Sequence, residues 1–344
     1  MSYFLYLKEM LFLMAPDSSS PAPAPSGPNQ QFINWLLLAV LVVCVGMVAV
    51  MALQGNMKAA QGEQTAYLPC EDGPCMSFIA FGDNGSGDEN QMAVAHQMGL
   101  QYAKRPFQYA LMLGGNFEGG SGPARDGDTR FTQPYQALLD KHVRFVTALG
   151  SDDDASPKKQ QAEIQFFHMP GPYYSVPAGD ADFFVIDGNT FSKDTAQQQW
   201  LDQALSKSTA PWKIVIGHQP PFSSGAHGDD PGVNQLRSTL VPMLIQHNVD
   251  LYLSASDHDY ERFLPIAGVT YVVSGGGGAP LGDFGRIRAN SLLRVKRWHF
   301  VRFDLDAQHL RFEAIDENGH VFDIGHLDKA ADGTMSVKSS KGVS

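Results

Sequence analysis

Short apolar segments that end in a polar or glycine-rich turn recur along the central part of this chain, and this recurrence constrains the fold more than any single motif. The turns at their ends cover residues 82–85, 114–118, 150–154, 217–218 and 255–258. In an open α/β sheet, sites form where strands end and turns begin. The pattern therefore predicts one site assembled from five strand ends.

Helical patterns lie between several of these segments. Asp88 is placed to cap a helix running towards residue 103, and residues 131–140, 195–206 and 233–247 have helical character. Residues 173–176 and 183–187 can pair as a hairpin, and the alternating runs after residue 299 predict antiparallel strands. Strands that alternate with helices indicate a layered α/β fold.

Three of the turns carry motifs of a known family. Gly82-Asp83-Asn84-Gly85 reads Gly-Asp-x-Gly, Val215-Ile216-Gly217-His218 reads Val-x-x-His, and Ala255-Ser256-Asp257-His258 approximates Gly-His-x-His. With them, residues 77–327 resemble the calcineurin-like metallophosphoesterases, in their purple-acid-phosphatase-like branch. The resemblance implies a metallophosphoesterase-type β-sandwich flanked by helices.

The resemblance also implies a metal site. Enzymes of this family hold two metal ions about 3.5–4 Å apart, which orient a phosphate and activate a water. A carboxylate that bridges both ions is central to such a site. Asp83, His218 and His258 match metal ligands of the family.

Other ligand positions depart from the family pattern. Gly115 stands where the bridging Asp is expected, Glu118 where a Tyr ligand is expected, and Ser151 where an Asn is expected. Asp152 replaces the His that protonates the leaving group, and Ser256 replaces the first His of the last motif. An exposed Asp is ionised at neutral pH and is therefore a poor general acid.

Two functions remain open at this point. In the first, the domain keeps the fold, is catalytically impaired, and serves as an accessory or scaffold subunit of a membrane complex. In the second, it is an active phosphoesterase whose reduced site holds at most one divalent ion, Fe, Mn or Zn, on Asp83, Glu118 and His258, or on a rearranged set that includes Asp152. His227 is then a weak candidate for holding phosphate, and binding of a phosphorylated ligand without hydrolysis lies between the two.

The part before the domain divides into three segments. Residues 1–31 are rich in Pro, Ser and Ala and read as flexible chain, with Met1 or Met14 as the start. Residues 32–54 are almost continuously apolar, which predicts one transmembrane helix, because about 20 such residues span a bilayer. A signal peptide or a buried core helix is the alternative. Residues 55–75 form a linker, residues 76–328 the domain, and residues 329–344 a polar, frayed tail.

Cysteines and charge bear on location and partners. Cys70 and Cys75 lie close enough to form a disulfide in an oxidising compartment, or they remain free thiols. The disulfide favours an extracytoplasmic domain on a single-pass membrane protein. The formal net charge of −11 argues against a nucleic-acid partner, because phosphate backbones need clustered cations. The expected partners are the membrane and protein subunits of a membrane complex.

Overall fold

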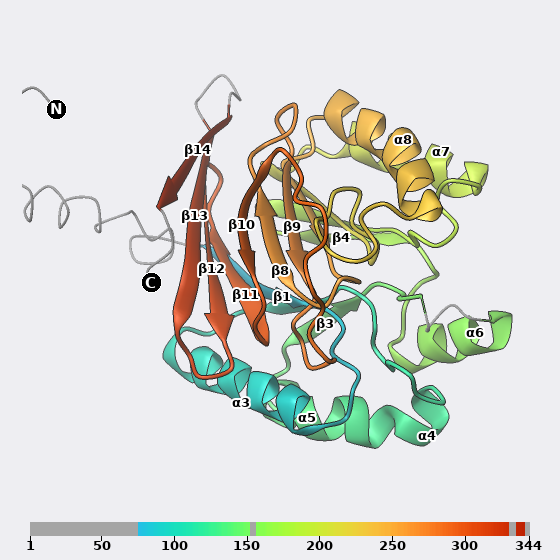
Figure 1. Cartoon of the computed structure of the whole chain (residues 1–344), viewed down its shortest axis with the longest axis vertical. Coiled ribbons are helices and arrows are strands. Elements are labelled where there is room, and N and C mark those ends of the chain that lie inside the picture. The colour runs from blue at the N-terminus through green and yellow to red at the C-terminus, as the bar shows by residue number, and fades with distance from the viewer. Residues whose placement is uncertain (1–74, 152–155, 330–334, 341–344) are drawn as a thin grey trace, which may run out of the picture. The chain divides into compact units, whose positions relative to one another are not determined.

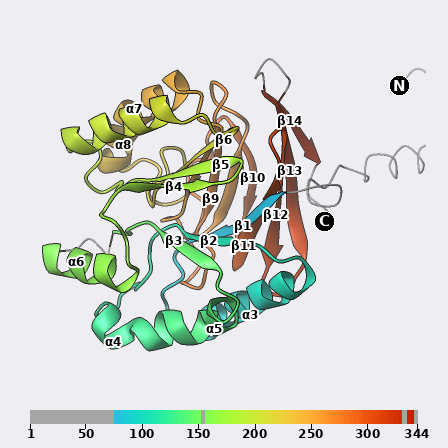
Figure 2. The ribbon, with the colours of Figure 1, turned by 180° about the vertical axis from the view of Figure 1, so that it is seen from behind.

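The computed structural model describes residues 75–151, 156–329 and 335–340. Within them, two seven-stranded sheets pack face to face, and helices cover their outer faces (Figures 1 and 2). This arrangement confirms the predicted layered α/β fold.

The first sheet combines a parallel part with an antiparallel part. β1, β2 and β3 run parallel, and the remaining strands join antiparallel from β11 outwards. In spatial order the strands are β14 (Met335–Ser340), β13 (Val321–Lys329), β12 (His309–Asp316), β11 (His299–Leu305), β1 (Met76–Phe81), β2 (Tyr109–Met112) and β3 (Arg144–Thr147).

The second sheet is also mixed. β5, β6, β7 and β9 run parallel, while β4, β8 and β10 pair antiparallel with their neighbours. In spatial order the strands are β10 (Ser291–Val295), β8 (Tyr260–Phe263), β9 (Thr270–Ser274), β7 (Leu251–Ser254), β6 (Trp212–Ile216), β5 (Ala181–Val185) and β4 (Tyr174–Ala178).

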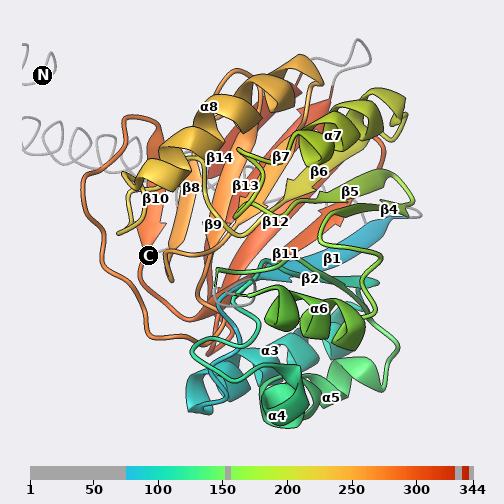
Figure 3. The same cartoon turned by 90° about the vertical axis from the view of Figure 1, so that its right-hand side faces the viewer.

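Helices cover each sheet separately (Figure 3). Val94 and Tyr135, from helices at the first sheet, pack in one cluster with Ile79 of β1. Leu201 and Leu240 of α7 and α8 pack against the second sheet. The helical elements are α3 (Glu89–Lys104), α4 (Pro123–Gly127), the π-helix η1 (Asp128–Thr132), α5 (Gln133–Leu139), α6 (Pro157–Phe166), α7 (Thr195–Lys207) and α8 (Pro231–Gln246).

The main core lies between the sheets. Phe78 of β1 stacks on Phe303 of β11 with ring centroids 4.6 Å apart, and it meets Phe183 of β5 edge-on at 5.1 Å. Trp212 is fully buried in the same cluster. Large rings from both sheets therefore hold the layers together, and each buried aromatic contributes a large apolar area.

Local signals in the sequence were mostly confirmed. Asp88 caps α3, because its side chain accepts hydrogen bonds from the amides of Asn90 and Gln91. β4 and β5 form the predicted antiparallel hairpin. Gly319, in the turn between β12 and β13, has a φ of 85°, which suits glycine.

The expected frayed tail is wrong in part, because β14 pairs antiparallel with β13. An edge strand is held by backbone hydrogen bonds, so a polar sequence does not exclude it.

The predicted transmembrane segment, residues 32–54, lies outside the described residues. Among the helices that the structure does describe, none is long and apolar enough to cross a bilayer. Cys75 is disulfide-bonded, but Cys70 also lies outside the described residues, so their pairing stays a prediction.

Candidate functional site

The ends of β1, β2, β6 and β7 meet through direct backbone hydrogen bonds. The Asp83 amide donates to the Gly114 carbonyl at 2.8 Å, and the Ala255 amide donates to the His218 carbonyl at 2.9 Å. A Cβ at Gly82 would lie 2.4 Å from the Ala255 Cβ, so only glycine allows this approach. The predicted convergence of these strand ends is confirmed.

Asp83 lies at the centre of the convergence. It is fully buried and has a φ of 52°, a left-handed conformation that directs its carboxylate back across the strand ends. Its Oδ2 accepts a hydrogen bond from the Ser256 amide at 2.8 Å. Its Oδ1 lies 3.9 Å from Nε2 of His218 and 3.7 Å from Nε2 of His258. Two imidazoles therefore converge on one carboxylate oxygen.

Both imidazoles are oriented by backbone carbonyls. Nδ1 of His218 lies 3.0 Å from the Leu113 carbonyl, and Nδ1 of His258 lies 2.9 Å from the Pro280 carbonyl. A carbonyl oxygen only accepts, so Nδ1 carries the proton in the neutral ring. Nε2 then presents its lone pair towards Asp83, which is the tautomer that binds a metal ion.

Glu118 completes a set of three donors. Within the described residues, Asp83, Glu118 and His258 form the single group of three or more acidic, His or Cys side chains with ligand atoms all within 4.8 Å of one another. Arg130 holds the Glu118 loop to the first motif by donating to the backbone carbonyls of Gly85 and Glu118. No motif in the sequence indicated this positioning role of Arg130.

Gly115 is the position at which the family resemblance places a bridging carboxylate. Its φ is 71°, and a Cβ built there would lie 2.6 Å from Oδ1 and 2.8 Å from Cα of Asp83. The loop therefore has no room for a side chain between Asp83 and Gly115. The residues present suit one cation on Asp83, Glu118 and His258, since carboxylate oxygens and an imidazole nitrogen bind divalent ions. They do not supply the shared carboxylate of a two-metal centre.

The order of these strand-end groups matches a family profile. The profile of the calcineurin-like phosphoesterases matches residues 75–276. The chain belongs to this family. In a calcineurin-like phosphoesterase, a bound cation supplies Lewis-acid chemistry, and in this chain Asp83, Glu118 and His258 are the residues that would hold it.

Several known proteins are similar to this calcineurin-like phosphoesterase. Purple acid phosphatase 7 of Arabidopsis thaliana is 26% identical over 235 residues, which is 59% of this chain and 70% of that protein. A purple acid phosphatase, PPD1, from yellow lupin (Lupinus luteus) superposes with a TM-score of 0.63 at 18% identity, covering 78% of this chain and 56% of that one. GAP50, the anchor in the inner membrane complex of Plasmodium, also superposes with a TM-score of 0.63 at 19% identity, covering 78% of this chain and 90% of that one.

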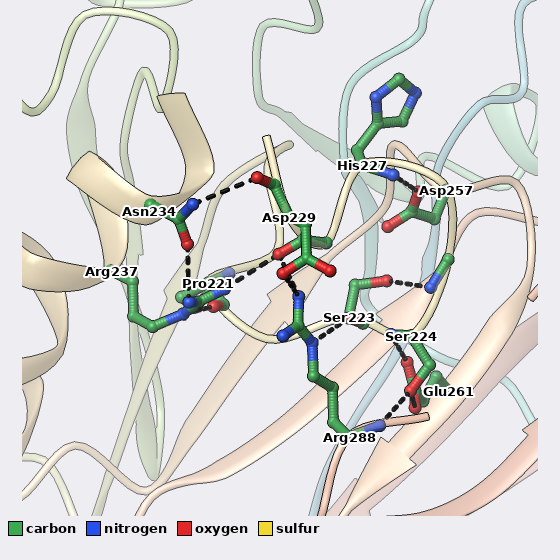
Figure 4. Close-up of polar contacts among 12 residues, drawn as sticks. Pro221, Ser223, Ser224, His227, Asp229, Asn234, Arg237, Asp257, Glu261 and Arg288 are labelled. Atoms are coloured by element: carbon green, nitrogen blue, oxygen red, sulfur yellow. Dashed lines mark hydrogen bonds and ion pairs between the residues drawn. The ribbon is translucent and has the colours of Figure 1, made fainter. Parts of the chain in front are cut away.

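Among the other predicted site residues that the structure describes, Ser151 and His227 are not part of the three-donor group. Asp152 is outside the described residues. Ser151 is exposed, and its Oγ accepts a hydrogen bond from Gln219 at 3.2 Å. His227 is 51% exposed, and its Nδ1 lies 2.9 Å from the Asp230 carboxylate. His227 touches the last motif only through its backbone amide (Figure 4).

Sequence reasoning missed a row of buried acids beside His258. Asp257, Asp259 and Glu261 are almost fully buried. Burial, and next the charges of Asp257 and Glu261, raise the pKa of Asp259 to about 9, so this carboxyl is protonated at neutral pH. The acidic alternation 257–259–261 was the available signal, but their burial was not evident from the sequence.

These acids position the loop that carries His227 (Figure 4). Glu261 accepts hydrogen bonds at 2.6 Å from both the amide and the hydroxyl of Ser224, and Asp257 accepts one at 2.7 Å from the His227 amide. Arg288 donates to the Ser223 carbonyl at 2.8 Å. Asp257 and Glu261 therefore fix the loop beside the site, whereas neither carboxyl oxygen of Asp259 has a hydrogen-bond partner among the described residues.

Proposed function

We propose that this domain is a catalytically impaired calcineurin-like phosphoesterase that serves as an accessory or scaffold subunit at a membrane. The observation that carries the proposal is Gly115, whose backbone leaves no space for the bridging carboxylate next to Asp83. Without that carboxylate, two cations would repel each other with no shared anion between them. The exposed Ser151 also fails to supply the amide ligand of the second site.

A second candidate function is hydrolysis with one cation. The three-donor group of Asp83, Glu118 and His258 supports it. One divalent ion there, Fe, Mn or Zn, can polarise a phosphoryl oxygen and lower the pKa of a bound water. The group that would protonate the leaving oxygen is missing from this set, so slow turnover, or binding of a phosphorylated ligand without turnover, is the expected limit.

The membrane part of the proposal rests on separate support. The apolar segment 32–54 has the length of a membrane span, and GAP50, with the same fold, is named as an anchor in a membrane complex. The disulfide at Cys75 fits an oxidising, extracytoplasmic side. We infer a single-pass protein whose domain contacts other subunits.

The full chain in detergent should therefore show little phosphatase activity. We expect turnover of an aryl phosphate, with Mn²⁺, Fe²⁺ or Zn²⁺ added, to stay far below the ~10 s⁻¹ median of ordinary enzymes. The metal content, measured by mass spectrometry, should be at most one ion per chain. Turnover near that median, abolished by His258→Ala and accompanied by two ions per chain, would contradict the proposal. His320→Ala, which removes a 75% exposed imidazole between β12 and β13, is the matched control.

Residues 32–54 should anchor the chain. We expect the full chain to stay with membranes after an alkaline wash, whereas a chain that lacks residues 1–55 should be released, because only a spanning helix resists that treatment. Fractionation followed by immunoblotting measures both forms. Release of the full chain by the wash would show that the anchor assignment is wrong.

A further inference from the structure

Three large aliphatic side chains are exposed at one corner of the second sheet. Leu264 follows β8 and is 48% exposed, Ile287 precedes β10 and is 50% exposed, and Leu292 lies on β10 and is 37% exposed. The Leu264 amide donates to the Asn290 carbonyl at 2.8 Å, which places the end of β8 against the segment that carries the other two. Apolar side chains that gather on a surface mark an interaction site.

The same segment is strongly basic. Residues 286–297 carry five of the chain's 25 Lys and Arg and no Asp or Glu, although the whole chain has a net charge of −11. The charge of the whole chain hid this feature from sequence analysis. Two of the cations have acidic partners at their ends: Arg288 pairs with Asp229 at 2.8 Å and Arg297 with Asp316 at 3.1 Å.

The remaining three cations are available to an external anion. Arg286 is exposed and makes no hydrogen bond or ion pair with a residue that the structure describes. Arg294 donates to the Ser291 hydroxyl at 2.6 Å rather than to a carboxylate. Lys296 pairs with Asp283, but both side chains are exposed, at 44% and 89%, and such surface pairs exchange readily.

The charge pattern argues against a second copy of this chain. β10 is an edge strand that pairs with β8 among the described strands, so a copy could in principle add to it. In a symmetric antiparallel pair of two β10 strands centred on Val295, Arg294 of each copy would face Lys296 of the other, and like charges opposite each other are destabilising. β10 is also short and carries a bulge between Ser291 and Leu293, features that protect an edge from strand addition.

The composition of the corner also differs from that of a protein-binding hot spot. Such hot spots are enriched in Trp, Tyr and Arg, with Leu under-represented, and this corner has Arg but neither Trp nor Tyr. Here Ile287 and Leu292 lie on the same segment as Arg286 and Arg294, and the backbone of Leu264 is hydrogen-bonded to that segment. Aliphatic side chains that enter the headgroup boundary, with cations at the level of the phosphates, are the chemistry of docking on an anionic lipid surface.

We propose that this corner, made of Leu264, Arg286, Ile287, Leu292, Arg294 and Lys296, docks the domain on an anionic phospholipid surface. A membrane span alone would keep the domain near a bilayer without fixing its orientation. Docking at the corner fixes which face of the two sheets points away from the membrane. This role does not depend on whether the metal site is active.

The test uses the full chain with vesicles of brominated phosphatidylcholine, with or without phosphatidylglycerol. Ile287→Trp reports contact with lipid through quenching by bromine, read above the background of the chain's four tryptophans. We expect this indole to be quenched when phosphatidylglycerol is present and less at high salt, since screening weakens the attraction. Leu100→Trp is the matched control, because Leu100 is 43% exposed on α3. Its indole should not be quenched.

The charges are tested by Arg286→Gln combined with Arg294→Gln in the Ile287→Trp background. The loss of two cations should lower the ratio of docked to undocked domain about 30-fold, at roughly 1 kcal/mol per cation. Equal quenching at positions 287 and 100 would overturn the proposal. Quenching at position 287 that does not depend on phosphatidylglycerol would overturn it as well. Flotation of the vesicles reports separately whether the chain is anchored, so failure of the anchor and failure of the corner are distinguishable.

Discussion

Asp323→Ala is expected to lower the free energy of unfolding by about 3–5 kcal/mol, because it leaves a buried guanidinium without its carboxylate. Asp323 of β13 accepts two hydrogen bonds from Arg262 of β8, at 2.6 and 2.7 Å, and a third from the Tyr260 hydroxyl. The Arg262 and Asp323 side chains are 3% and 0% exposed. The pair joins the two sheets, so its loss should loosen the sandwich as a whole. Urea unfolding, followed by circular dichroism, measures the effect.

Two variants separate this buried pair from ordinary surface charge. Asp283→Ala breaks the exposed pair with Lys296 and should cost no more than about 1 kcal/mol. Arg262→Met combined with Asp323→Leu removes both charges together and should recover most of the loss, because a packed apolar pair replaces the ion pair. If Asp323→Ala costs no more than Asp283→Ala, the pair does not hold the sheets together.

The sequence predicted the fold well where its signals were local. Apolar runs such as 76–81 and 212–216 became β1 and β6, and Asp88 became a helix cap, because these features depend on neighbouring residues. β10 was not predicted, since an exposed edge strand with five residues needs little apolar character. Its pairing with β8 depends on a segment that is distant in the chain.

The residues of the candidate site could be predicted from the sequence, but their geometry could not. Asp83, Glu118 and His258 were candidate ligands, and the structure brings them together. The tautomers of His218 and His258 depend on carbonyls of Leu113 and Pro280, which no motif specifies. The burial of Asp259 likewise depends on packing across the sheet.

Gly115 gives the sharpest example. Its identity alone predicts that the family's bridging carboxylate is missing, and it suggests that Gly115→Asp would restore the bridge. Two observations argue against that suggestion. Gly115 has a φ of 71°, and a Cβ at this position would lie 2.6 Å from Oδ1 of Asp83. The loop has adapted to glycine, so the lost ligand cannot be returned by one substitution without moving the backbone.

Gly115→Asp is therefore expected to damage the site rather than rebuild it. A side chain in a left-handed, overpacked position should lower the free energy of unfolding by roughly 2–5 kcal/mol. Displacement of Asp83 should weaken binding of Mn²⁺ about 10-fold or more, the usual effect of disturbing groups around a metal ligand. Calorimetric titration of the full chain with Mn²⁺, together with urea unfolding, measures both quantities. We expect no second metal site even when three further changes complete the family's ligand set. These changes are Ser151→Asn, Asp152→His and Ser256→His.

Gly115→Ala distinguishes strain from charge, because it adds the same Cβ without a carboxylate. We expect it to destabilise the fold nearly as much as Gly115→Asp, since the Cβ itself would lie 2.8 Å from the Asp83 Cα. Asp has one advantage over Ala, in that its short polar side chain tolerates the left-handed region better. A Gly115→Asp variant that is as stable as the natural chain and binds two Mn²⁺ ions would show that the loop can still move aside. The chain would then lack only the bridging carboxylate, and its backbone at residue 115 would not exclude a second metal ion.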